Sequence, residues 1–168
     1  MTRHSKLGLF VAVALSTTVL AGCSGQRGSL APRDGPVNSN LVSESNIRAM
    51  PPHSPQRALL RWWRDLQYEN ITGYFARLAG PLRRKRLRSD ASGSYVVRAS
   101  GALIPTKPTI VRATTKGNRA TIFTRIETRH PVGESRTYTT SFPQSFVLRN
   151  NGAGWQLADD TFVMQRAG

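Results

Sequence analysis

The sequence predicts an α+β domain in which helices from its first half pack on a curved antiparallel sheet from its second half. After Ser54, apolar residues recur at helical spacings of three and four. After Ser94, apolar and polar residues alternate as they do in half-buried strands. Turn-forming Gly and Asn separate the alternating stretches. Helices followed by consecutive strands are typical of α+β domains, and residues 54–168 have the size of one domain.

Two helices are predicted at the start of this domain. Ser54 is a good N-cap, Pro55 suits the first helical position, and apolar residues then recur at i, i+4 and i+7, which predicts a helix over residues 55–68. A second helix is predicted over residues 71–78, and Gly80-Pro81 is expected to stop or kink it.

The sheet is predicted from five stretches and two turns. The first strands are expected at residues 95–100 and 120–127, and later ones at 136–142, 146–150 and 155–163. Gly117-Asn118 and Asn151-Gly152 supply turns. Pro143 cannot donate to a strand ladder, so it marks a bend, bulge or edge.

The first 22 residues have the layout of a secretory signal peptide. A basic start is followed by an uncharged apolar run over residues 7–20 and by the small pair Ala21-Gly22. The apolar run is shorter than the roughly 20 residues that a helix needs to cross a bilayer. It therefore suits a removable signal better than a permanent span.

Leu20-Ala21-Gly22-Cys23 resembles the lipobox of bacterial lipoproteins at each of its four positions. The resemblance implies that a diacylglyceryl group is attached to Cys23 and that cleavage precedes it. A disulfide is excluded because Cys23 is the one cysteine of the chain. A catalytic thiol needs a positioned base in a shaped pocket, which a segment between a signal and a flexible stretch does not offer. The remaining alternative is an accidental match of a short motif.

Residues 23–53 are interpreted as the lipidated cysteine and a flexible tether. The stretch is rich in Ser, Gly, Pro and Asn and has no sustained apolar periodicity. Whether Leu41, Val42, Ile47 and Met50 dock on the following domain is left open by the sequence.

The helical segment ALLRWWRDLQYENITGYFARLAG and the later GWQLADDTF resemble the nuclear transport factor 2-like superfamily, which includes ketosteroid isomerase-like proteins. The resemblance covers most of residues 54–165 and implies a cone-shaped roll. In that roll some aromatic residues line a cavity between helices and sheet, and the rest fill the core. The ligand-binding candidates are Trp62, Tyr74, Phe123, Tyr138 and Trp155. Because members range from enzymes to assembly domains, the fold alone does not choose a function.

The chain is strongly basic, with a formal net charge of +15 at pH 7. The densest run of cations is a candidate for contact with anionic lipid or an anionic envelope polymer, and it comprises Arg83, Arg84, Lys85, Arg86 and Arg88. The plain alternative is a solvated face of a protein rich in Arg. Nucleic acid is not expected as a partner, because the chain carries an export signal and no recognition motif.

No nucleophile elbow, glycine-rich phosphate loop, zinc pattern or calcium loop occurs in the sequence, so we expect no metal or cofactor. Asp65, Glu127 and His130 are possible bases, but no second group is spaced to orient them. Of Asp159 and Asp160, at most one is expected to face inward. The sequence therefore favours a non-catalytic lipoprotein that faces outside the cytoplasm and binds an envelope component. The alternative is a ketosteroid isomerase-like or dehydratase-like enzyme acting on a small apolar ligand.

Overall fold

The structure is a computed structural model that describes residues 40–132 and 136–167. The predicted signal peptide, Cys23 and the tether up to residue 39 lie outside the described residues. The described helices are α1 (Glu44–Arg48), α2 (Pro55–Gln67), α3 (Ile71–Ala76), α4 (Gly80–Ser89), α5 (Ser94–Leu103) and α6 (Thr161–Ala167). The described strands are β1 (Thr106–Lys116), β2 (Arg119–Val132), β3 (Arg136–Asn150) and β4 (Trp155–Leu157).

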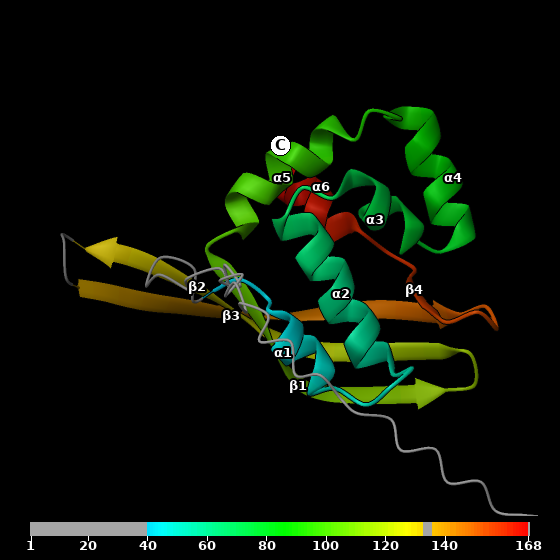
Figure 1. Ribbon diagram of the computed structural model, residues 1–168, viewed down its shortest axis with the longest axis horizontal. Coiled ribbons are helices and arrows are strands. Elements are labelled where there is room, and N and C mark those ends of the chain that lie inside the picture. The colour runs from blue at the N-terminus through cyan, green and yellow to red at the C-terminus, as the bar shows by residue number, and fades with distance from the viewer. Residues whose placement is uncertain (1–39, 133–135, 168) are drawn as a thin grey trace, which may run out of the picture. The chain divides into compact units, whose positions relative to one another are not determined.

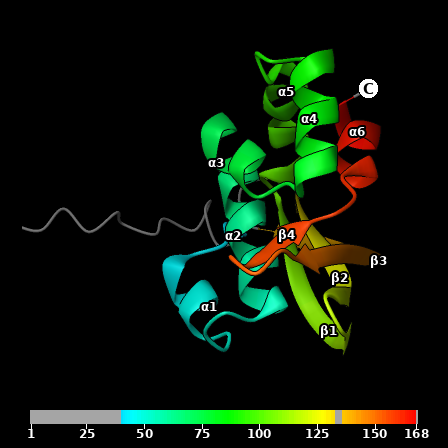
Figure 2. The same ribbon diagram turned by 90° about the vertical axis from the view of Figure 1, so that its right-hand side faces the viewer.

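The four strands form one antiparallel sheet in the order β1-β2-β3-β4, and the helices lie on one of its faces (Figures 1 and 2). This arrangement confirms the predicted α+β class. On β2, alternate residues such as Ala120, Ile122 and Ile126 are fully buried and face the helices. The residues between them face away from the helices, on what we call the outer face of the sheet.

The core lies between the helices and the inner face of the sheet. From α2 it receives Leu59, Trp63 and Leu66, and from β3 it receives Phe146 and Leu148, each at most 2% exposed. A fully buried side chain of this kind stabilises a fold by roughly 1.5–3 kcal/mol, so the contact of α2 with the sheet is a large part of what holds the two layers together.

The predicted starts of both helices are confirmed, and the helices end at Gln67 and Ala76 rather than at residues 68 and 78. Ser54 Oγ accepts the backbone N–H of Arg57 at 3.2 Å and caps α2, which begins at Pro55. Asn70 caps α3 in the same way through Gly73 N–H at 3.0 Å. The chain breaks after α3, as Gly80-Pro81 predicts, and the same two residues begin α4.

Two stretches predicted as strands are helical. Residues 95–100 lie in α5, where Tyr95, Val96, Ala99 and Leu103 are buried at helical rather than alternating spacing. The residues 155–163 form a strand only as far as Leu157 and then enter α6. A short apolar run can match both the helical and the strand periodicity. For residues 95–100, contact with α2 and α6 favours the helix.

The β2–β3 hairpin is longer than predicted. His130 and its neighbour Pro131 lie within β2, beyond the strand that was predicted to end at residue 127. β3 continues through Pro143, where β4 does not reach, because β4 pairs only with residues 148–150. Pro143 therefore lies on a sheet edge, as predicted.

The last residues of the predicted tether pack on the domain. Val42 and Ile47 are 1% exposed, and Val42 N–H donates to Gln67 Oε1 at 2.9 Å. Their apolar side chains are buried, and α1 packs against α2. Residues 40–53 therefore belong to the folded unit rather than to a free linker. Every described core residue lies between Val42 and Val163, so we expect the chain of residues 34–168 to fold without residues 1–33. None of the helices described has the length and apolar character required for a membrane span.

Candidate functional site

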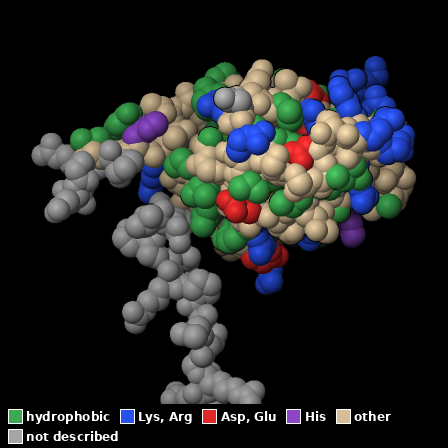
Figure 3. All heavy atoms as spheres, turned by 90° about the horizontal axis from the view of Figure 1, so that it is seen from above, with side chains coloured by type: hydrophobic (Ala, Val, Ile, Leu, Met, Phe, Trp, Pro, Cys, Tyr) green, Lys and Arg blue, Asp and Glu red, His purple; other side chains and the backbone are tan. Residues whose placement is uncertain are grey.

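Helix α4 presents most of the predicted basic run to solvent. It contains no buried residue, and Arg83, Arg84, Lys85 and Arg88 are exposed. In the part of the chain that the structure describes, these four side chains make no ion pair. Lys and Arg side chains gather over this end of the molecule in the space-filling view (Figure 3). The result is a helix that carries positive charge and buries almost nothing.

Arg86 differs from its neighbours, because it holds α4 to the body of the domain. Its Nε donates to Asp160 Oδ2 at 2.9 Å and its Nη2 to Asp160 Oδ1 at 2.5 Å. The side chain of Arg86 is 13% exposed and that of Asp160 is 0% exposed. Hydrogen bonding to this carboxylate raises the pKa of Arg86. Of the five cations proposed for anionic contact, Arg86 is therefore the one with a structural role.

Asp160 also accepts a hydrogen bond from Tyr74 Oη at 2.8 Å. Burial raises the pKa of Tyr74, and the negative charge of Asp160 raises it further. The phenol therefore stays protonated and serves as a donor. Together, Arg86 and Tyr74 satisfy a carboxylate that has no access to water, as a buried charge requires.

The turn between β4 and α6 explains why one carboxylate of the Asp159-Asp160 pair is buried. Asp159 Oδ1 accepts Thr161 N–H at 3.0 Å and Thr161 Oγ1–H at 2.6 Å, so Asp159 remains at the surface and its side chain holds the first residue of α6. The hydrogen bond from Thr161 Oγ1 lowers the pKa of Asp159. Asp160, one residue later, points inward, which agrees with the expectation that at most one of the two does so.

The space between helices and sheet is filled by a cluster of aromatic rings. Trp63 packs against Phe146 with ring centroids 6.0 Å apart and against Phe162 at 5.7 Å. Trp62 lies 5.9 Å from Tyr74 and 5.8 Å from Phe146. Each of these rings is 6% exposed or less. The cluster is therefore a packed core and not the wall of an open cavity.

The structure does not gather the five ligand-binding candidates into one site. Trp62 and Tyr74 are in contact inside the core. Phe123 is on the outer face of the sheet, where the Arg112 guanidinium lies 4.4 Å from its ring centroid. Tyr138 is 53% exposed on the β2–β3 hairpin, and Trp155 begins β4.

Each of the possible bases is occupied by a neighbour. Asp65 pairs with Arg77 and accepts Asn70 Nδ2–H at 3.0 Å. Glu127 pairs with Arg125 at 3.3 Å.

His130 hydrogen-bonds Thr140 Oγ1 at 2.8 Å and stacks on Tyr138 at 4.6 Å. None of the carboxylates that the structure describes hydrogen-bonds to its ring. Among the described residues, no three His, Cys, Asp or Glu side chains cluster as metal ligands do.

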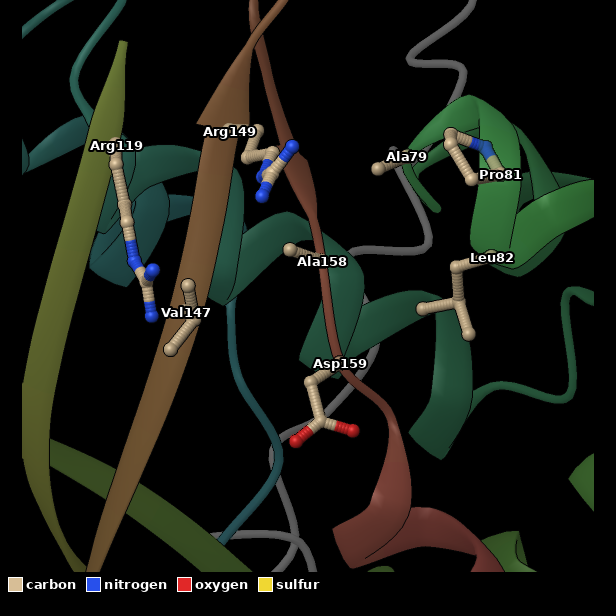
Figure 4. A pocket seen from close by; sticks show the side chains of 8 residues that line it. All are labelled: Ala79, Pro81, Leu82, Arg119, Val147, Arg149, Ala158 and Asp159. Atoms are coloured by element: carbon tan, nitrogen blue, oxygen red, sulfur yellow. The ribbon is translucent and has the colours of Figure 1, made fainter. Parts of the chain in front are cut away.

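A groove of about 400 Å³ lies between α4 and the ends of β2 and β3 (Figure 4). One wall carries Arg119, Val147 and Arg149, and the other carries Pro81 and Leu82. Ala79, Ala158 and Asp159 complete the lining. Arg119 and Arg149 carry no local signal in the sequence, because only strand register reveals that they are direct partners across β2 and β3.

No family model matches the chain, and no curated protein matches it. Among solved structures, a protein of Streptomyces avermitilis described as a candidate dehydratase of the NTF2-like family aligns with 60% of this chain and 86% of its own. The sequence identity is 12% and the TM-score is 0.38. The α+β assignment therefore stands on the described helices and strands themselves.

Proposed function

We propose that this protein is a non-catalytic binding or assembly module of the bacterial cell envelope, anchored by lipid on Cys23. The observation that supports a binding role over catalysis is the packed aromatic interior. An acid–base enzyme needs a base that reaches substrate in a water-excluding pocket. Asp160, the one fully buried carboxylate of the described residues, is instead held by Arg86 and Tyr74.

The mechanism proposed is tethered presentation. A diacylglyceryl anchor supplies two acyl chains, which is what stable membrane attachment requires. Attachment confines the domain near the bilayer, so weak contacts with neighbouring components act at a high effective concentration. The folded domain would contact those components on the outward side of the membrane.

Helix α4 is the proposed contact surface. Residues two apart on a helix point to nearly opposite sides, so the inward direction of Arg86 directs Arg84 and Arg88 outward. Near an anionic membrane, each such cation gains roughly 1 kcal/mol. An anionic envelope polymer offers the same kind of attraction.

Metabolic labelling tests the anchor. Cells producing the full-length protein are given labelled palmitate and fractionated, and a Cys23→Ala variant is compared with a Ser24→Ala control. The wild type and the control are expected to carry label and to remain with membranes, whereas Cys23→Ala is expected to carry none. Label on the Cys23→Ala variant would contradict the anchor.

Vesicle co-sedimentation tests the contact surface. The chain of residues 34–168 is mixed with vesicles of phosphatidylglycerol and phosphatidylcholine in varied ratio and salt. Substituting Arg83, Arg84, Lys85 and Arg88 by Gln is expected to reduce binding to the anionic vesicles strongly. Binding that ignores anionic lipid content, salt and these four substitutions would overturn the role of α4.

A further inference from the structure

Three cations lie in a row across the outer face of the sheet. Lys116 at the end of β1 pairs with Arg119 at the start of β2, and Arg119 pairs with Arg149 of β3. The bulge in β1 between Ile110 and Arg112 turns Lys116 to this face. All three side chains are exposed, and no ion pair is recorded for any of them in the described ranges.

Like charges directly opposite one another on neighbouring strands destabilise a sheet. The acidic residue on the outer face of β2, Glu127, does not relieve the row. It is paired with Arg125 and lies eight residues along the strand from Arg119, which is about 26 Å at the rise of a β-strand. That separation exceeds the Debye length in physiological salt, about 8 Å. Glu127 therefore does not compensate the row, and none of the described carboxylates forms an ion pair with it.

The row ends in the groove beside α4, and the groove is not purely polar. Arg119 and Arg149 line it together with an apolar surface made by Pro81, Leu82 and Val147 (Figure 4). Its volume of about 400 Å³ falls within the range of small-molecule sites, roughly 300–1,000 Å³. A ligand that matches it has a negative group next to a short apolar segment.

Asp159 restricts the charge that such a ligand can carry. Its carboxylate lies at the end of the groove away from Arg149, where Thr161 holds it (Figure 4). The two guanidinium groups of Arg119 and Arg149 and the one carboxylate of Asp159 give the lining a net charge of +1. A singly charged phosphate diester fits this balance better than a doubly charged phosphate monoester does.

We propose that the groove binds the phosphodiester headgroup of an anionic amphiphile, of which phosphatidylglycerol is the simplest example. Arg119 and Arg149 hold the phosphate, because guanidinium donors match its oxygens in geometry and charge. Leu82 and Val147 contact the first carbons beyond the headgroup. The site is separate from the exposed cations of α4, which attract a surface without selecting a molecule.

The inference rests on the proposed function only for the supply of anionic lipid at the anchoring membrane. Its test uses the chain of residues 34–168, which lacks Cys23. Failure of the groove would therefore leave the anchor untouched, and failure of the anchor would leave binding in the groove intact.

The experiment is a titration followed by the Nε–H signals of arginine side chains in NMR spectra. The probes are dihexanoyl phosphatidylglycerol below its critical micelle concentration, dihexanoyl phosphatidylcholine and inorganic phosphate. Phosphatidylglycerol is expected to shift the Arg119 and Arg149 signals saturably. The affinities of the other two probes are expected to be lower by about tenfold or more. Equal binding of inorganic phosphate would mean a simple anion site and would overturn the lipid assignment.

Matched variants distinguish binding at the groove from general attraction to the positive charge of the protein. Arg119→Gln with Arg149→Gln is expected to weaken phosphatidylglycerol binding by about tenfold or more. Arg112→Gln with Arg125→Gln removes the same charge from the same face outside the groove and is expected to change affinity by less than about threefold. An equal loss in both double variants would overturn the proposal. Near-ultraviolet circular dichroism of the tryptophans verifies that each variant is folded.

A third variant tests the apolar wall. Val147→Thr keeps the shape and the β-branch but places a hydroxyl in the groove. It is expected to weaken phosphatidylglycerol binding while leaving the weak response to inorganic phosphate unchanged. Unchanged phosphatidylglycerol affinity would exclude the proposed contact with the carbon chain.

Discussion

Arg86 and Asp160 form a two-pronged ion pair that joins helix α4 to the turn before α6, with N–O distances of 2.9 and 2.5 Å. The two residues are 74 positions apart in the sequence. Because α4 buries no residue of its own, this pair is a principal attachment of the basic helix to the domain. The proposed contact surface on α4 therefore depends on a residue that faces away from it.

Removing one partner of this pair is expected to be costly. Arg86→Gln leaves the Asp160 carboxylate buried without its cation, which typically costs about 3–5 kcal/mol in free energy of unfolding. Arg84→Gln, on the exposed side of the same helix, is expected to change it by less than about 0.5 kcal/mol. Urea denaturation monitored by tryptophan fluorescence measures both. Similar midpoints for the two variants would show that the pair contributes nothing.

Tyr74→Phe is expected to destabilise the domain because Asp160 then loses its neutral donor. The cost for a buried hydrogen bond to a charged acceptor is about 1.5–3 kcal/mol. Tyr68→Phe is the matched control, since Tyr68 is 57% exposed, and it should leave the melting temperature nearly unchanged. A melting temperature for Tyr74→Phe equal to that of the control would contradict this role of the phenol.

Gly93→Ala is expected to destabilise more than Gly152→Ala does. Both glycines have positive φ, at 69° and 89°, so alanine is strained at either position. At Gly93 the added Cβ would also lie 2.6 Å from Ile71 Cγ2, whereas at Gly152 it would meet nothing within 4 Å. The difference in unfolding free energy should be about 1–3 kcal/mol. Equal losses of unfolding free energy in the two variants would mean that α3 and the start of α5 move apart without cost to admit the added Cβ.

The acid limb of stability should depend on Thr161. The pKa of Asp159 is lowered in the folded protein, so its ionised form stabilises the fold above its unfolded pKa, about 3.9, and that contribution is lost as pH falls through the folded pKa. Thr161→Val removes the hydroxyl donor and should reduce stability at neutral pH by less than about 1 kcal/mol, and the difference from wild type should vanish as pH falls below the folded pKa of Asp159. Thr161→Ser keeps the donor and should follow the wild type. Thermal melts across this pH range make the comparison.

Local signals in the sequence sufficed for the helices that begin with a cap. Ser54 followed by Pro55 marks the start of α2 to the residue, and Gly80-Pro81 marks the boundary between α3 and α4. The class followed from these helices and from the alternation in β2. Local chemistry of this kind depends on residues that are neighbours in the chain.

Sequence reasoning failed where packing decides between two patterns. Val96 and Val97 favour a strand by propensity, but α5 buries Val96, Ala99 and Leu103 along one helical face against α2 and α6. Phe162 and Val163 were likewise expected in a strand but lie in α6, whose first residue, Thr161, is held by Asp159. Neither outcome is contained in the spacing of the residues alone.

The candidate site was predicted only in part. The run of cations was found because it is contiguous in the sequence, but its helix, α4, was not predicted, and which of its cations turns inward depends on Asp160. The opposition of Arg119 and Arg149 depends on the register of the β2–β3 hairpin. Contacts between distant positions of this kind have no signature in a single sequence.

The parallel bridge between Leu78 and Leu157 fixes an order of events for a chain that emerges from one end. Ala79 N–H donates to Leu157 O at 2.7 Å and Leu157 N–H to Arg77 O at 2.8 Å, so the junction of α3 and α4 gains its backbone partners only when β4 has appeared. Until residues 157–160 have been made, helix α4 has neither this backbone contact nor the Asp160 partner of Arg86. The position of a helix from the first half of the domain is therefore completed only by residues that are synthesised about 70 positions later.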